Sequence, residues 1–371
     1  MRGNNVLGII FSNVHDDKIR ELTEKRTMGS VPFGGRYRLI DFPLSNMVNS
    51  GINKVGVITK KNYQSLMDHL GSGKAWDLSR KREGLVMLPP FGNESTVPNS
   101  RIESLYSIKN FLHNSHEEYV LLTDCDVVCN IDYADVVYKH TKNQADITVV
   151  YRFGKLPKKI CDPTVYTLDP DGRVQDMLIN PNTDSECNYG LSMMLINRHI
   201  LMKIVDDCVS RNLYSFKRDF LQRNVLNLRI YGYEFQGLTQ TICSMNSYFN
   251  ANMSLMLPTV RKELFNPIRP IYTKVRDDMP ARYGLGSSAA NSLIADGCVI
   301  EGTVKNSVLF RGVHVGKGTK IENCVIMQDS VIGSDCHMKY VVMDKDVIIK
   351  NERSLLGFKS YPVFISKGSV V

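Results

Sequence analysis

Four cationic side chains lie near the start of the sequence, beside two consecutive glycines: Lys25, Arg26, Arg36 and Arg38. A guanidinium group presents several N–H donors in a planar fork that matches the oxygens of a phosphate or a carboxylate. The cluster therefore predicts a site for a phosphorylated anion. The same cations could instead form ordinary ion pairs with nearby carboxylates, which are Glu21, Glu24 and Asp41. Both hypotheses stay open at the level of the sequence.

Short apolar runs indicate the elements that must position a second candidate, Asp126. Three of these runs would be buried on both faces of a sheet, at residues 6–11, 54–59 and 119–123. Segments with helical spacing lie between them, at 44–50 and 102–112. Strands that alternate with helices predict a parallel α/β sheet, whose ligand crevice lies at the carboxyl ends of its strands. Residues just after the three runs, Asp126 among them, are therefore the ones to inspect.

Elements beyond residue 146 are expected to extend the same sheet. Apolar residues indicate strands at 147–151 and 190–196, and helical spacing indicates helices at 199–207 and 246–257. Prolines at 258, 267 and 270 then mark a segment that crosses to a second domain. We expect a first domain at residues 1–250 and a linker at residues 251–285.

A six-residue repeat fills the rest of the chain. From Ile294 onward an aliphatic residue opens each unit, and a small or acidic residue usually follows it. One inward aliphatic per unit, with a small residue at each corner, predicts a left-handed parallel β-helix at residues 286–371. Some β-helices of this kind use a histidine base for acyl transfer, and His314 and His337 lie in this one. Ordinary surface histidines are the other interpretation.

Composition narrows the function classes. The 371 residues are 43% hydrophobic and 23% charged, which is typical of a folded globular protein of more than one domain. The net charge of +8 is spread without long basic runs, so the sequence does not indicate nucleic-acid binding. Nine cysteines form no Cys-x-x-Cys pair, and no apolar run is long enough for a signal sequence or a membrane span. We expect a cytoplasmic protein.

Residues 22–46 carry a family resemblance. The block Phe33-Gly-Gly-Arg-Tyr-Arg-Leu-Ile-Asp-Phe-Pro-Leu-Ser-Asn46, with Trp76-Asp-Leu78 further on, resembles the glucose-1-phosphate adenylyltransferases, or ADP-glucose pyrophosphorylases. The likeness runs through most of the chain, including the repeats. It implies a nucleotide-diphospho-sugar transferase domain with a Rossmann-like mixed sheet, followed by the β-helix.

Several of the family's functional positions hold other residues in this chain. The family's glycine-rich triphosphate loop aligns with Asn13-Val-His-Asp-Asp-Lys-Ile19, which has no glycine. Side chains at Val14 and Asp16 would fill the space where phosphates approach the backbone. The family's phosphate lysine aligns with Met28, and the lysine that meets the sugar phosphate aligns with Asn180. Pro181 and Gly190 remain as remnants of the substrate pocket.

The metal site implied by the resemblance is also incomplete. Members of the family hold Mg²⁺ with two aspartates. Asp126 aligns with the first of these, whereas the second aligns with Thr241, a neutral hydroxyl. We therefore expect no intact catalytic set, with Asp126 as its remnant and the candidate ligand of any metal. No cofactor of the chain's own is expected, and Mg²⁺ would belong to a catalytic partner.

The joint loss of these groups on a recognisable scaffold resembles the non-catalytic partner subunit found in some Gram-positive bacteria. The resemblance implies a hetero-oligomer, a tetramer by expectation, with a catalytic pyrophosphorylase subunit. Retention of Lys25, Arg26, Arg36 and Arg38 beside a degenerate site favours the binding of an effector, such as a sugar phosphate, or a contact between subunits. An active enzyme with relocated ligands is the alternative. A more distant one is a small-molecule kinase, suggested by the glycine-containing stretch Gly284-Leu-Gly-Ser-Ser-Ala-Ala290.

Overall fold

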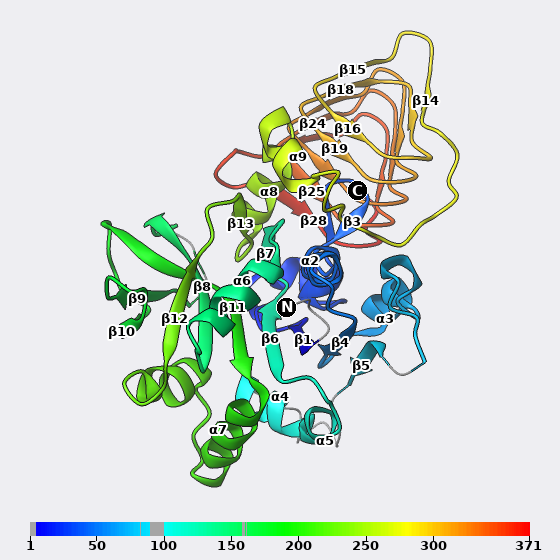
Figure 1. The fold of residues 1–371 in the computed structure, drawn as a ribbon. Helices are drawn as coiled ribbons and strands as arrows, with labels where there is room; N and C mark the ends of the chain where they lie inside the picture. The colour runs from blue at the N-terminus through cyan, green and yellow to red at the C-terminus, as the bar shows by residue number, and fades with distance from the viewer. Residues whose placement is uncertain (1–4, 82, 90–99, 158–159, 161) are drawn as a thin grey trace.

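A mixed β-sheet forms the first part of the chain and a solenoid of short parallel strands forms the second (Figure 1). The computed structural model describes residues 5–81, 83–89, 100–157, 160 and 162–371. Helices cover the sheet, and the last coils of the solenoid lie above its carboxyl edge (Figure 1). None of the helices in this described part of the chain is both long and apolar enough to cross a membrane.

Parallel strands form the centre of the sheet, in the order β6-β1-β4-β5. Their bounds are Val6–Phe11 (β1), Lys54–Ile58 (β4), Gly84–Leu88 (β5) and Tyr119–Asp124 (β6). Every residue of β1 and β6 is buried, as expected for strands that are covered on both faces. The three apolar runs of the sequence are thus central strands, and the α/β prediction is confirmed.

Antiparallel pairing extends the sheet beyond β6. There the order runs β6-β11-β9-β10, and β8 pairs antiparallel with β11 and parallel with β12. These strands are Ile147–Lys155 (β8), Thr164–Leu168 (β9), Val174–Ile179 (β10), Glu186–Asn197 (β11) and Ile230–Glu234 (β12). Two smaller pairs lie outside the main sheet, β2 (Pro32–Phe33) with β3 (Tyr37–Arg38), and β7 (Val127–Cys129) with β13 (Thr239–Thr241).

Nine α-helices are found among the described residues. They are Arg20–Thr23 (α1), Asp41–Asn49 (α2), Gln64–Leu70 (α3), Arg101–Ser107 (α4), Lys109–His113 (α5), Tyr133–Lys142 (α6), Arg198–Ser210 (α7), Met245–Ser254 (α8) and Pro258–Leu264 (α9). The single helix predicted at 102–112 is in fact the pair α4 and α5, which meet at Ile108. The predicted linker at 251–285 contains the end of α8 and all of α9, which begins at Pro258.

Short strands stack into three parallel sheets of five strands each in the second part. The first sheet contains Arg282–Tyr283 (β14), Val299–Ile300 (β17), His314–Val315 (β20), Val331–Ile332 (β23) and Ile348–Ile349 (β26). The second contains Ser288–Ala290 (β15), Thr303–Lys305 (β18), Lys320–Glu322 (β21), His337–Lys339 (β24) and Ser354–Leu356 (β27). The third contains Leu293–Ile294 (β16), Val308–Leu309 (β19), Val325–Ile326 (β22), Val341–Met343 (β25) and Val363–Ile365 (β28).

The inward residues of the solenoid come from the repeat units. Ile300, Val315, Ile332 and Ile349 are aligned from strand to strand and are almost fully buried. Each coil thus contributes one aliphatic side chain to this continuous interior column, which cannot be buried by one coil alone. The prediction of a parallel β-helix of hexapeptide repeats is confirmed.

A continuous apolar core joins the two parts. Buried side chains of α8, such as Phe249, belong to the same cluster as Phe310, Val325 and Val342 of the β-helix. The Phe249 and Tyr340 rings also meet edge to face, with their centroids 6.2 Å apart. Because the core runs across the junction, the β-helix is docked on the α/β part.

Candidate functional site

The candidate catalytic edge lies where β1 and β6 end side by side. These strands are parallel and Phe11 pairs with Asp124, so the loop after β1 meets the corner between β6 and β7. That arrangement brings together His15, Asp124 and Asp126, all three buried. The crevice predicted at the carboxyl ends of the strands is therefore the place where Asp126 lies.

The loop that replaces the family's glycine-rich segment is folded back on the protein. Asp16 Oδ1 accepts a hydrogen bond from the backbone N–H of Met28 at 2.7 Å, and its carbonyl oxygen accepts one from the Thr23 hydroxyl at 2.6 Å. Burial raises the pKa of Asp16 to about 7. A carboxylate thus takes a backbone donor that a phosphate would otherwise be free to use. Met28 itself is 2% exposed and packs in the core, so no cation stands at this position.

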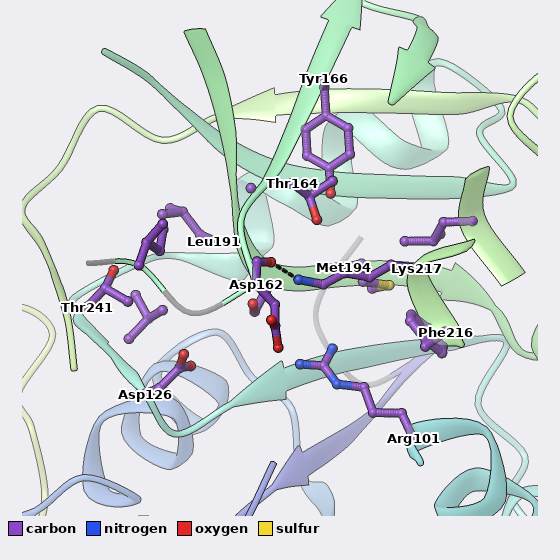
Figure 2. Close-up of a pocket in the computed structure, with 15 residues that line it drawn as sticks. Arg101, Asp126, Asp162, Thr164, Tyr166, Leu191, Met194, Phe216, Lys217 and Thr241 are labelled. Carbon is purple, nitrogen blue, oxygen red and sulfur yellow. Dashed lines mark hydrogen bonds between the residues drawn. The ribbon is translucent and has the colours of Figure 1, made fainter. Parts of the chain in front are cut away.

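Thr241 stands beside Asp126, as the alignment of the sequence predicts. It pairs with Val127 across the β13 and β7 ladder, and the next residue, Ile242, donates its N–H to the carbonyl oxygen of Asp126 at 2.7 Å. Both side chains line one pocket (Figure 2). The second carboxylate that Mg²⁺ has in the family is absent here, and a hydroxyl supplies no compensating charge. These residues do not fit the family's two-aspartate magnesium site.

Basic groups approach the same pocket from the other side. Figure 2 shows Arg101, Phe216 and Lys217 opposite Asp126 and Thr241. Arg101 donates to Asp124 Oδ2, and Lys217 donates to the carbonyl oxygen of Asp162. Burial acts to raise the pKa of Asp124, but Arg101, His15 and Lys217 together outweigh it and hold that pKa below its ordinary value, whereas burial raises the pKa of Asp126. The pocket is therefore lined by charges that already interact with one another.

The volume of this pocket decides what it can hold. The cavity measures about 20 Å³, which is close to the roughly 10–15 Å³ that a single water needs. Gly190 lines it, and a Cβ there would come within 3.0 Å of the Tyr166 ring. Pro181, the other predicted remnant, follows β10 and is not among the lining residues. As folded, the enclosed part of the pocket is far smaller than a hexose phosphate.

The predicted anion cluster is divided by the fold. Arg26 forms a buried ion pair with Asp344 of the β-helix, with Nη1 to Oδ1 at 2.8 Å and Nη2 to Oδ2 at 3.0 Å. Arg38 donates its side chain to the carbonyl and hydroxyl oxygens of Ser65 at 2.5 and 2.9 Å. Burial lowers the pKa of Arg38 to about 10. Neither guanidinium forms an ion pair with Glu21, Glu24 or Asp41, the partners that the sequence suggests. Only the backbone N–H of Arg38 donates to Asp41 Oδ2.

Lys345 is a cation of this cluster that the sequence did not predict. It follows Asp344 in the β-helix and is electrostatically coupled to Arg38 and Arg26. Arg36 and Lys25 are exposed, and Arg36 is coupled to Arg311 instead. The structure thus brings together Arg26, Arg38 and Lys345 at the junction of the two parts, while Lys25 and Arg36 lie on the surface. Asp344 pairs with Arg26, and Asp41 and Asp68 act on Arg38, whereas Lys345 is repelled by Arg38 and Arg26 more strongly than Asp344 attracts it.

The positive charge of Lys345 should lower the stability of the fold in a way that depends on pH. Burial, with the nearby Arg38 and Arg26, lowers the pKa of Lys345 from 10.5 to about 7. Because the folded pKa lies below the unfolded one, the charged lysine destabilises the fold fully below pH 7, and this effect fades as the pH rises from 7 to 10.5. We expect Lys345→Met to raise the free energy of unfolding by about 1–2 kcal/mol at about pH 6 and hardly at all at about pH 10.

Urea unfolding at the two pH values measures this difference. Lys350→Met, at an exposed lysine five residues further along the same β-helix, is the matched control and should change the free energy by less than about 0.5 kcal/mol at either pH. A Lys345 effect that is equal at both pH values would show that packing, not charge, is responsible.

The positions of the residues decide two further hypotheses from the sequence, the histidine base of the β-helix and the kinase loop. His314 and His337 are both exposed, and they lie on different sheets of the β-helix, β20 and β24, so they do not converge on one site. The stretch from Gly284 to Ala290 is the turn after strand β14 together with strand β15. A kinase phosphate loop requires a following helix, so the kinase interpretation is wrong.

Comparison with known proteins places the chain among nucleotidyl transferases. Residues 8–247 match the nucleotidyl transferase family, and residues 278–359 match the GlmU-like C-terminal hexapeptide family. The chain is 36% identical over 371 residues to the glycogen biosynthesis protein GlgD of Bacillus subtilis (strain 168), a match that covers 100% of this chain and 98% of that protein.

Other relatives include a second GlgD protein and a glucose-1-phosphate adenylyltransferase. The GlgD of Geobacillus stearothermophilus is 38% identical over 371 residues, with 99% of this chain and 97% of that protein covered. A glucose-1-phosphate adenylyltransferase of Thermotoga sp. (strain RQ2) is 32% identical over 333 residues, with 86% of this chain and 76% of that protein covered.

Proposed function

The chain belongs to the nucleotidyl transferase family and, within it, to the glucose-1-phosphate adenylyltransferases, and from this membership we propose that it is a regulatory, catalytically degenerate subunit. The enzyme it would regulate makes ADP-glucose and diphosphate from ATP and glucose 1-phosphate in glycogen biosynthesis. One observation carries the proposal: the site keeps its scaffold and Asp126, but the positions of two lysines and one aspartate hold Met28, Asn180 and Thr241.

The geometry of the pocket supports the same proposal. The loop after β1 is closed by Asp16, and the neighbouring pocket holds little more than a water molecule. The full-length matches to two GlgD proteins also favour a regulatory role over an active enzyme with relocated ligands. In this function the chain needs no cofactor of its own, and Mg²⁺ acts in the catalytic partner. Its place is the cytoplasm, where it acts without nucleic acid or membrane.

The proposed partner is a catalytic ADP-glucose pyrophosphorylase subunit, in a hetero-oligomer that we expect to be a tetramer. The outer face of one β-helix sheet offers apolar surface for such an assembly. Val331 and Ile348 are aligned on neighbouring strands, Val370 bridges to Ile348, and all three are 43–59% exposed. Exposed apolar side chains in a row are typical of surfaces that become buried against another protein.

A sugar phosphate is the proposed effector, and the junction of the two parts is its proposed site. Arg26, Arg38 and Lys345 supply the positive charge, with Lys25 and Arg36 on the adjoining surface. An anion bound there would touch both the α/β part and the β-helix. Because it could prefer one arrangement of the two parts, it could change the catalytic partner with which the chain assembles.

Coexpression with a catalytic homologue tests the proposal. We expect the two chains to purify as one complex, and the complex to differ from the catalytic chain alone by about 5- to 150-fold in substrate affinity or effector response. Size-exclusion chromatography and initial-rate kinetics measure the two outcomes. Arg36→Ala with Arg38→Ala should blunt the effector response without preventing assembly. Failure to associate, or association with unchanged kinetics, would contradict the proposal.

A further inference from the structure

Three buried side chains at the corner between β1 and β6 have no role in the proposed function. His15 comes from the loop after β1, Asp124 is the last residue of β6, and Asp126 precedes β7. Their side chains are 5%, 2% and 3% exposed. The parallel pairing of β1 with β6 brings the two loops together, so residues more than 100 positions apart in the sequence form one cluster.

The distances between these groups are those of ligands around one ion. His15 Nε2 lies 3.5 Å from Asp126 Oδ2 and 3.7 Å from Asp124 Oδ2, and one donor atom of each residue lies within 4.8 Å of the others. N–H···O hydrogen bonds are shorter, about 2.7–3.2 Å. Two ligands bound tetrahedrally at about 2.0–2.2 Å from one metal are about 3.3–3.6 Å apart. The distances are too long for direct hydrogen bonds, and they are those of a loose ion pair between a protonated His15 and the two carboxylates or of ligands around one shared cation.

Unsatisfied polar atoms provide a second and independent indication. Within the described part of the chain, Asp124 Oδ1, Asp126 Oδ1 and Asn13 Nδ2 are buried without a hydrogen-bond partner. Buried polar atoms are nearly always bonded, and carboxylate oxygens left alone are especially unfavourable. A cation bound by the two Oδ1 atoms would satisfy both carboxylates, whose Oδ2 atoms already face His15. Arg101, which holds Asp124 through Oδ2, would then be the outer partner that orients a metal-binding carboxylate.

We propose that His15, Asp124 and Asp126 form a binding site for a divalent transition-metal ion, Zn²⁺ or Mn²⁺. One imidazole nitrogen with two carboxylates suits these ions better than Mg²⁺, which favours oxygen ligands alone. The proposed site shares only Asp126 with the family's pair of magnesium aspartates, because its other two ligands are His15 and Asp124. It would tie the loop after β1 to the β6–β7 corner and keep the degenerate site closed. It goes beyond the proposed function, because assembly with a partner neither requires nor excludes it.

Metal titration of the purified full-length chain tests the site. After treatment with a chelator, we expect the chain to bind one Zn²⁺, measured by calorimetry, and one Mn²⁺, measured by electron paramagnetic resonance. His15→Asn and Asp124→Asn should each weaken Zn²⁺ binding by at least about tenfold. His337→Asn, at an exposed histidine of the β-helix, is the matched control and should bind as the unchanged chain does.

A measurement on the unaltered chain keeps the test decisive if a variant fails to fold. Pulsed electron paramagnetic resonance should detect a ¹⁴N nucleus coupled to the bound Mn²⁺, because His15 is the nitrogen ligand of the site. Absence of binding would overturn the proposal and show that His15 itself neutralises the two carboxylates. Mg²⁺ binding as tight as Zn²⁺ binding and unaffected by His15→Asn would overturn it too, since Asp126 alone would then explain the metal. Neither result bears on association with a catalytic subunit.

Discussion

Purified alone and supplied with ATP, glucose 1-phosphate and Mg²⁺, the chain is expected to form ADP-glucose at least about ten-thousand-fold more slowly than a catalytic relative. Loss of one charged contact that acts in the transition state costs about 3 kcal/mol, or roughly a hundredfold in rate. Met28, Asn180 and Thr241 stand at three such positions. Two independent losses already multiply to about ten-thousand-fold, and the closed loop at Asp16 adds a further obstacle.

Release of diphosphate, followed with a coupled assay, measures this rate. A catalytic glucose-1-phosphate adenylyltransferase assayed in the same buffer is the positive control. The chain should stay near background at every Mg²⁺ concentration, because added Mg²⁺ cannot replace a carboxylate missing beside Asp126. Turnover within tenfold of the control would mean that the ligands have been relocated, and the regulatory proposal would lose its main support.

The central strands are the part of the fold that the sequence predicts best. β1, β4 and β6 begin at the predicted residues and end within one residue of the prediction, because strands buried on both faces are continuous apolar runs with polar residues at their ends. The strand β5, a short strand at the edge of the sheet, is not predicted from the sequence, nor are β9, β10 and β12. The last three alternate or mix polar and apolar residues over only five or six positions, which is a weak signal. Pro258 could have been recognised as the first residue of α9, since proline is favoured there.

Contacts between distant segments are what the sequence could not provide. Lys25, Arg26, Arg36 and Arg38 form one cluster in the sequence, yet only Arg26 and Arg38 share an environment in the fold. Their neighbours Asp344 and Lys345 lie more than 300 residues away in the sequence. No local pattern indicates such a pairing. The site at His15 is an intermediate case, because the ends of β1 and β6 were expected to meet although the partners of His15 were not named.

The pairing of Arg26 with Asp344 leads to a large expected effect on stability. The two side chains are 3% and 4% exposed and share two hydrogen bonds of 2.8 and 3.0 Å across the junction of the two parts. Removing one partner of a buried ion pair leaves the other charge buried and uncompensated, which usually costs about 3–5 kcal/mol. Lys345 and Arg38 would make the remaining charge at Arg26 still less favourable. We therefore expect Asp344→Asn to lower the free energy of unfolding by about 3–5 kcal/mol.

Urea unfolding followed by circular dichroism measures the loss, and the same β-helix turn offers a matched control. Asp346 lies two residues further on and forms an exposed ion pair with Lys367 at 3.5 Å, so Asp346→Asn should cost less than about 0.5 kcal/mol. Replacing both partners, with Arg26→Met and Asp344→Leu, should recover most of the stability because no buried charge is then left alone. If Asp344→Asn were as mild as Asp346→Asn, the junction would be held by its apolar core alone. The contact between Arg26 and Asp344 would then not be the means by which an anion at Arg26 and Arg38 favours one arrangement of the α/β part and the β-helix.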